Sequence, residues 1–243
     1  MAAIRDVPRQ PLAALSERVG PGALAHERTL AVVPALAALL PAGLRRGSVV
    51  VTDGVAATSL ALALAAGPSA AGAWLGVVGM PSLGVLAAAE LGVAIERLFL
   101  VAAPPVEQWT EIVAAVIDGA ELVMATPPPG VRAAAARRVQ ARLVSRGAVL
   151  LLAGGEQIGG FQPDLRFATT GAEWEGIERG AGRLRARRVR VAVGGRRAGG
   201  RLVTHELFLP APFGGIEVAT ETTALERTEL VAPTGGLDVA ASA

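Results

Sequence analysis

Short, uninterrupted apolar runs alternate with longer helix-like segments between residues 49 and 153. Such runs are typical of strands buried on both faces, whereas a strand with one wet face alternates apolar and polar residues. The pattern predicts strands at 49–52, 74–78, 97–101, 121–125 and 148–153, and helices at 59–66, 83–91, 105–118 and 131–146. Strands separated by helices form βαβ units. We therefore expect an α/β fold with a mostly parallel central sheet and helices on both faces.

The pattern changes on both sides of this alternating region. Residues 24–40 predict another helix, interrupted by Pro34, and residues 1–22 predict a flexible segment. Residues 165–169, 185–193 and 200–207 predict antiparallel strands, the last two forming a hairpin around the turn-rich sequence GGRRAGG. Residues 208–243 hold five acids and one arginine. We therefore expect one domain over 23–210 and a flexible acidic tail over 211–243.

Composition excludes several kinds of site. The chain has no cysteine, so disulfides, thiolate zinc sites and cysteine nucleophiles are excluded, and the positions of His26 and His205 do not suggest a metal pair. No charged residue occurs between Gly54 and Ala89. Glycine and proline break this stretch repeatedly, which favours a buried helix and strand over a membrane span. We expect a cytoplasmic protein.

The sequence GSVVVTDGVAATSLALALAA has the order of parts of a phosphate-binding loop: a strand, a glycine, a turn and a helix. Gly54 matches the first glycine of such a loop, but Ala56 and Ala57 stand where glycine and lysine bind phosphate. The turn is about three residues too short. All 23 basic residues are arginine, so no lysine can substitute. We therefore expect a degenerate loop at Gly54, Ala56, Ala57 and Thr58 that binds no cofactor. Thr58 is the expected helix N-cap, with no cation nearby.

Three sequences resemble the RecA recombinase core over residues 28–210: AGLRRGSVVVTDG, AAAELGVAIERLFLVAAPPVEQWTEIV and RARRVRVAV. The resemblance implies a RecA-like core that ends in an antiparallel hairpin and acidic tail. It also places the catalytic carboxylate of RecA near Met80 and its magnesium-supporting aspartate at Ala125, where this chain has no acid. The resemblance therefore implies that the protein is not an ATPase.

A RecA-like chain without ATPase motifs resembles the actinobacterial ImuA-prime family. That resemblance implies a non-catalytic adaptor in damage-induced translesion synthesis and mutagenesis. The implied partners are an ImuB-like homologue of Y-family polymerases and the error-prone C-family polymerase, with RecA and DNA as further candidates. It implies no membrane partner and association with the nucleoid when DNA is damaged.

Two groups of arginines are candidates for binding DNA or an acidic partner. Each group lies in a segment without acids. The alternative for each is a solvent-exposed face with no binding role. The candidates are Arg138 and Arg142 in the predicted helix 131–146, and Arg183, Arg185, Arg187, Arg188, Arg190, Arg196 and Arg197 around the predicted hairpin.

Large apolar side chains near the end of the domain are candidate anchors for a protein partner: Trp174, Phe208, Phe213 and Ile216. For Trp174 the alternative is a tryptophan at the edge of the core, and for the tail it is simple disorder. Two other functions stay open. The arginines could serve a DNA-binding recombination or repair factor, and a cell-division regulator of the SulA type shares RecA-like ancestry.

Overall fold

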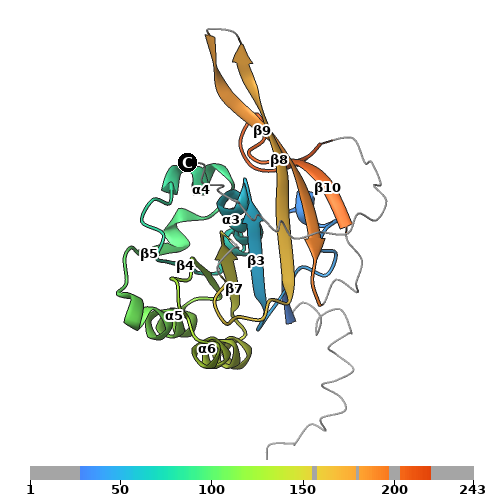
Figure 1. Ribbon diagram of the computed structural model, residues 1–243. Coiled ribbons are helices and arrows are strands. Elements are labelled where there is room, and N and C mark those ends of the chain that lie inside the picture. Colours follow the sequence, from blue (N-terminus) through green and yellow to red (C-terminus); the bar gives the residue numbers. More distant parts are fainter. Residues whose placement is uncertain (1–27, 155–157, 179–180, 197–202, 220–243) are drawn as a thin grey trace, which may run out of the picture.

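A computed structural model describes residues 28–154, 158–178, 181–196 and 203–219 (Figure 1). Among these residues, a nine-stranded sheet has the strand order β11-β10-β9-β8-β3-β7-β6-β4-β5. The strands from β8 to β5 pair in parallel, and those from β8 to β11 pair antiparallel. The predicted α/β class with a mostly parallel sheet and a C-terminal antiparallel hairpin is confirmed.

The parallel part of the sheet contains the strands that the apolar runs predicted. They are β3 (Val49–Gly54), β4 (Leu75–Val78), β5 (Leu98–Val101), β6 (Leu122–Ala125) and β7 (Val149–Ala153). Side chains of β3 alternate between two cores, with Val50 on one face and Val49 and Val51 on the other. Both faces are dry, which explains why the sequence shows no polar alternation.

Helices cover both faces of this parallel part. On one face lie α3 (Ala57–Ala70) and α4 (Val85–Glu90), and on the other lie α5 (Trp109–Gly119) and α6 (Ala133–Arg146). The chain moves from β3 toward the β5 edge through α3 and α4, then returns to β7 through α5 and α6. Right-handed crossovers place helices on opposite faces when the direction of travel reverses.

Two helix predictions differ from the structure. Gly67 and Pro68 do not end α3, since Pro68 lies in its last turn and the helix continues to Ala70. Between residues 29 and 40 the helix expected over 24–40 is not formed. Instead β1 (Thr29–Leu30) pairs with β2 (Leu44–Arg45), and a 3-10 turn (Pro34–Leu36) begins at the proline. Leucine and alanine favour a helix there, but proline and the pairing with a distant strand override that propensity.

The antiparallel part begins where β8 (Leu165–Glu178) pairs with β3. It continues through β9 (Ala181–Gly194), β10 (Val203–Phe208) and β11 (Glu217–Val218). The predicted antiparallel pairing of 185–193 with 200–207 corresponds to β9 and β10. The outer ends of β8 and β9 form a second hairpin, which the sequence did not predict and which projects beyond the sheet in Figure 1.

The ordered domain extends past the predicted boundary at residue 210. Ala211 and Ala219 are buried, and β11 pairs with β10. Residues 211–219 therefore belong to the folded domain rather than to the expected tail. The predicted flexible segment 1–22 and the tail beyond residue 219 lie outside the described residues, as does most of the GGRRAGG turn.

Candidate functional site

The turn after β3, where the sequence suggested a lost phosphate loop, is closed by a threonine from β8. The Thr169 hydroxyl accepts a hydrogen bond from the Ala56 N–H at 2.9 Å and donates one to the Asp53 carbonyl at 2.8 Å. Thr169 is 2% exposed. A phosphate loop needs free, converging backbone N–H groups. Here Thr169 already occupies the Ala56 N–H, and the Gly54 N–H donates to the Asp53 carboxylate at 2.7 Å.

The backbone explains the glycine at position 54 without phosphate binding. Its φ is +87°, and an added Cβ would collide with the carbonyl oxygen of Thr169. Glycine is the residue that allows both this conformation and this close approach of two strands. The feature that resembled the first glycine of a phosphate loop therefore serves the β3–β8 pairing.

The start of α3 corrects the prediction for Thr58. The helix begins at Ala57, its N-cap is Ala56, and no side chain caps it. Thr58 is an exposed residue inside the first turn and is not the cap. Ala56 and Ala57 are buried, so their small side chains pack beneath the turn.

Arg187 corrects the expectation that no cation lies near this turn. Its Nη2 donates to the Ser59 hydroxyl at 2.8 Å, and its Nε donates to the Leu209 carbonyl at 2.8 Å. The guanidinium lies 5.1 Å from the ring centre of Trp174. Burial lowers the pKa of Arg187 from its ordinary value. Arg187 thus joins the hairpin, α3 and the segment after β10.

Two other β9 arginines pair with acids from neighbouring strands. Arg190 contacts Glu206 at 2.9 Å, and Arg188 lies 3.7 Å from Glu206 and 4.0 Å from Glu175. Arg188 also lies 5.2 Å from the ring centre of Phe208. The segment around β9 contains no acid, but the sheet brings acids beside it. This pairing reduces the positive charge that Arg188 and Arg190 present to solvent.

The remaining hairpin arginines differ in their surroundings. Arg183 and Arg185 are exposed, and neither has an ion-pair partner in the described part of the chain. Arg196 donates to the Gln162 carbonyl at 3.4 Å. Arg197 lies outside the described residues.

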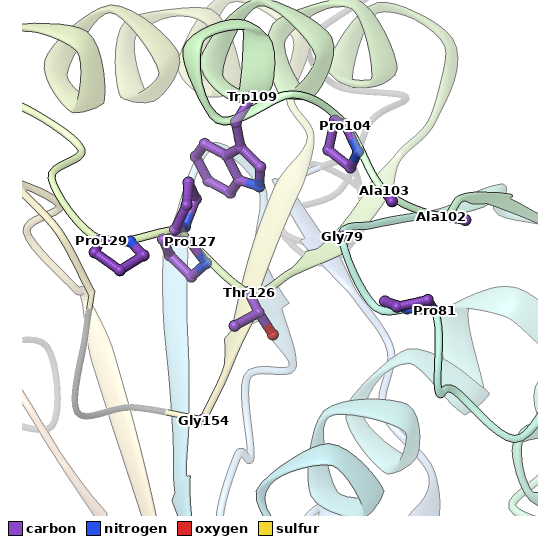
Figure 2. A pocket seen from close by; sticks show the side chains of 11 residues that line it. Gly79, Pro81, Ala102, Ala103, Pro104, Trp109, Thr126, Pro127, Pro129 and Gly154 are labelled. Atoms are coloured by element: carbon purple, nitrogen blue, oxygen red, sulfur yellow. The ribbon is translucent and has the colours of Figure 1, made fainter.

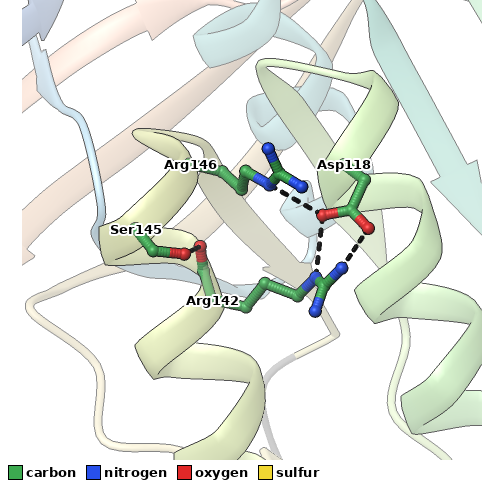
Figure 3. Close-up of polar contacts among 4 residues, drawn as sticks. All are labelled: Asp118, Arg142, Ser145 and Arg146. Carbon is green, nitrogen blue, oxygen red and sulfur yellow. Dashed lines mark hydrogen bonds and ion pairs between the residues drawn. The ribbon is translucent and has the colours of Figure 1, made fainter.

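On α6, an aspartate from α5 holds two arginines (Figure 3). Asp118 accepts from Arg142 Nε at 2.8 Å and from Arg146 Nε at 2.9 Å, and Arg142 Nη2 also contacts it. The hydrogen bond with Arg142, followed by that with Arg146, lowers the pKa of Asp118, while Asp118 raises the pKa of Arg142. Arg138 is exposed and has no ion pair with any described residue.

The candidate apolar anchors fall into two kinds. Phe213 is 99% exposed, and Trp174 is 41% exposed beneath Arg187. Phe208 and Ile216 are half-buried, and Ile216 packs against the core on the α3 face. Phe213 lies in the turn after β10, where the Gly215 N–H donates to the Glu90 carbonyl at the end of α4. The structure thus presents Phe213 on a turn that is fixed to the domain.

Neither position that the resemblance assigned to catalysis carries an acid in the structure. Ala125 is fully buried at the end of β6, and Met80 is partly buried against the core. Within the described ranges, no three histidines or acids gather as metal ligands. In the same ranges, no helix is long and apolar enough to cross a membrane.

Comparison with known proteins assigns the chain to a family. Residues 38–158 match the family described as the MT3502 N-terminal domain. The chain is 37% identical over 149 residues to "Uncharacterized protein Rv3395c" of Mycobacterium tuberculosis (strain ATCC 25618 / H37Rv), covering 61% of this chain and 68% of that protein. The chain belongs to the family of that mycobacterial protein. The family match ends before β8, so it includes the parallel strands and leaves out the hairpin.

The residue that sequence reasoning missed at this site is Thr169. It lies more than a hundred residues from Ala56, and a buried threonine in a strand gives no local signal of a bridging role. The partners of the paired arginines, Glu206 and Asp118, were missed for the same reason.

Proposed function

We propose that this protein is a non-catalytic, RecA-like adaptor in damage-induced translesion synthesis. It would bridge an ImuB-like protein and the error-prone polymerase. The observation that carries the non-catalytic part is the β3 turn, where Thr169 occupies the backbone N–H that a nucleotide phosphate would need. The translesion role rests on the resemblance to the ImuA-prime family.

Two observations support the RecA-like part of the proposal. β3 lies in the middle of the sheet and leads through a glycine into α3 on one of its faces, as the resemblance requires of the phosphate-loop unit. The other resembling sequences also fall on elements of this sheet. ELGVAIERLFLV covers the end of α4 through β5, and RARRVRVAV lies in β9.

An adaptor needs an exposed surface for its partner, and Phe213 supports this part. A phenylalanine almost fully in water adds nothing to the packing of the domain, and aromatic side chains dominate binding at protein interfaces. Because the turn that carries it is hydrogen-bonded to α4, the side chain is presented without a large ordering cost.

Nucleotide titration tests the non-catalytic half. We expect no saturable change in melting temperature when ATP and Mg²⁺ are added to the full-length protein. A saturable rise of several degrees would mean that the nucleotide binds the folded state, and the proposal would fail.

Co-purification tests the adaptor half. The ImuB-like protein from the same organism should co-purify with the wild-type chain, and Phe213→Ala should lower the recovered amount at least about fivefold, as expected for an interface anchor. Val144→Ala is the matched control, since Val144 is an exposed apolar residue of α6 that is 69% exposed. If no complex forms with the wild-type chain, the assignment to translesion synthesis is wrong. If both variants bind equally, Phe213 is not the contact.

Direct DNA binding is a second candidate, favoured by Arg183 and Arg185 on the projecting hairpin. If it is correct, single-stranded DNA binding should weaken steeply with salt. Charge reversal at Arg183 and Arg185 should then weaken it at least about tenfold. The same reversal at Arg188 and Arg190 should matter less, because Glu206 already holds them. Equal losses in the two double variants would contradict this assignment.

A further inference from the structure

A crevice of about 590 Å³ opens at the carboxyl ends of the parallel strands (Figure 2). Its walls come from the segments after β4, β5, β6 and β7, and the start of α5 lies against them. The connection after β4 enters α4 on one face of the sheet, while that after β6 enters α6 on the other face. Open α/β sheets bind ligands where neighbouring connections diverge in this way.

The described residues that line the crevice carry no charged side chain. They are prolines, alanines and glycines, with Trp109 and Thr126 as the polar exceptions. A phosphate or an ammonium group would lose hydration here without gaining a counter-charge. The volume suits a small organic molecule. Because proline has a fixed φ, Pro127 and its two proline neighbours form a wall that loses little freedom on binding.

The crevice also holds a hydrogen-bond donor without an acceptor. Trp109 is 2% exposed, and among the described residues nothing accepts a hydrogen bond from its Nε1. The indole packs edge-on against Phe161, with ring centres 6.2 Å apart and planes at 77°, which fixes its orientation. A buried donor without a partner destabilises the fold, and an acceptor from a bound ligand would relieve that cost.

Gly79 leaves room beside this donor. A Cβ at position 79 would lie 3.6 Å from Trp109 Nε1 and 3.6 Å from the Thr126 carbonyl oxygen. In Figure 2 the indole lies above Thr126, and its nitrogen is on the side that faces Gly79. Position 79 therefore places no side chain beside the N–H.

We propose that this crevice binds a neutral, largely apolar ring compound that accepts a hydrogen bond from Trp109 Nε1 through a carbonyl or ring nitrogen. The ring would pack against the prolines, and the acceptor would satisfy the buried donor. This site is separate from the β3 turn and from Phe213, so it does not depend on the adaptor function. The lining residues all fall within the span that matches the family.

Three matched probes test the ligand chemistry: 1-indanone, indane, and the anion indane-1-carboxylate. Indane lacks the acceptor of 1-indanone, and the carboxylate adds a charge. In the ¹⁵N-labelled full-length protein, the indole N–H signals of the three tryptophans can be assigned with single Trp→Phe variants. We expect 1-indanone to move the Trp109 signal saturably and to bind at least about fivefold more tightly than either other probe.

Several results would overturn the proposal. They are the absence of a saturable shift at Trp109, equal affinity for 1-indanone and indane, tighter binding of the carboxylate, or shifts at Trp74 or Trp174 alone. Trp109→Phe removes the donor and should bring the affinities for 1-indanone and indane to within about twofold, measured by saturation transfer to the probe.

A glycine pair keeps the proposal testable if Trp109→Phe does not fold. Gly79→Ala places a methyl group beside Nε1 and should weaken 1-indanone at least about fivefold. Gly72→Ala is the control. Gly72 also has a positive φ, +101° against +73° for Gly79, but an added Cβ there would meet nothing within 4 Å. Unchanged binding in Gly79→Ala, or an equal loss in Gly72→Ala, would show that 1-indanone does not occupy the space beside Trp109.

Discussion

The end of β3 and the ends of β4 and β6 lie along the same edge of one sheet, but the polar groups at β3 are hydrogen-bonded and, among the described residues, a donor near β4 and β6 is not. At β3, a buried threonine and a half-buried arginine satisfy the turn and the first residues of α3. At β4 and β6, the chain leaves a crevice and an indole N–H without an acceptor among the described residues. At one edge of the sheet, the strand end that a sequence motif singles out can have its polar groups hydrogen-bonded within the protein, while a neighbouring strand end keeps a crevice and an unbonded donor.

The largest effect on stability is expected at Arg187, which links β9 to the start of α3 beside the turn after β3. Arg187→Ala removes hydrogen bonds to Ser59 and to the Leu209 carbonyl, so we expect a loss of about 2 kcal/mol in the free energy of unfolding. Urea denaturation measures it. Arg185→Ala, at an exposed position on the same strand, should change stability by less than about 0.5 kcal/mol. If the two variants are equally stable, Arg187 does not anchor this end.

A smaller loss is expected at Thr169. Thr169→Val keeps the shape of the side chain but leaves the Ala56 N–H buried without a partner, which should cost about 1–2 kcal/mol. Denaturation curves and amide hydrogen exchange at Ala56 report this change. Thr170→Val, at the next and exposed position of β8, is the matched control. A stable Thr169→Val variant would mean that the turn does not need its bridge.

Replacing Thr126, which lines the crevice after β6, should change the free energy of unfolding much less. Thr126 is exposed and donates to the Ala153 carbonyl at 3.2 Å, so water can replace the bond when Thr126→Val is made. We expect a change within about 0.5 kcal/mol. Comparing Thr126→Val with Thr169→Val in the same denaturation experiment tests the contrast directly. Similar losses would show that the hydrogen bonds at the end of β6 stabilise the fold as much as those at the end of β3.

The smallest effect is expected away from this edge, at the Asp118 ion pair between α5 and α6. Hydrogen bonds from Arg142 and Arg146 lower its pKa, so this carboxylate stabilises the fold above its ordinary pKa of 3.8. That contribution is lost as pH falls through the lowered value in the folded state. Asp118→Asn should therefore lose less stability than the wild type between about pH 5 and about pH 2. Parallel pH profiles in acid denaturation would contradict this role.

The elements of the parallel part could be predicted from sequence because burial on both faces leaves an unbroken apolar signature. The run at Leu122–Ala125 is an example: each of its side chains is buried, on alternating faces. The N-terminal helix was predicted wrongly because its leucines and alanines suit a helix, whereas Thr29 and Leu30 form a short strand with β2. Local propensity does not encode a partner strand farther along the chain.

The candidate site was less predictable, for a different reason. The sequence predicts that Ala56 and Ala57 lack phosphate-binding chemistry, but it could not show that Thr169 bonds the turn. Likewise, an arginine-rich strand looks unpaired when read alone, and only the sheet register brings Glu206 beside Arg190. The crevice went unnoticed because its walls come from several connections, and a run of prolines after β6 reads as an ordinary loop.

The register shifts in β8 decide where the projecting hairpin bends relative to the rest of the sheet. Pairing with β9 shifts register at two places, between Thr170 and Ala172 and between Glu175 and Ile177. Gly171, at the inner shift, has a φ of +61°. A strand bends at such a position, and an added Cβ at Gly171 would meet nothing within 4 Å. Thr169 lies on the inner side of this joint and Trp174 on the outer side. We therefore expect a force on the projecting hairpin to bend β8 at these two shifts before it strains the Thr169 bridge at the end of β3.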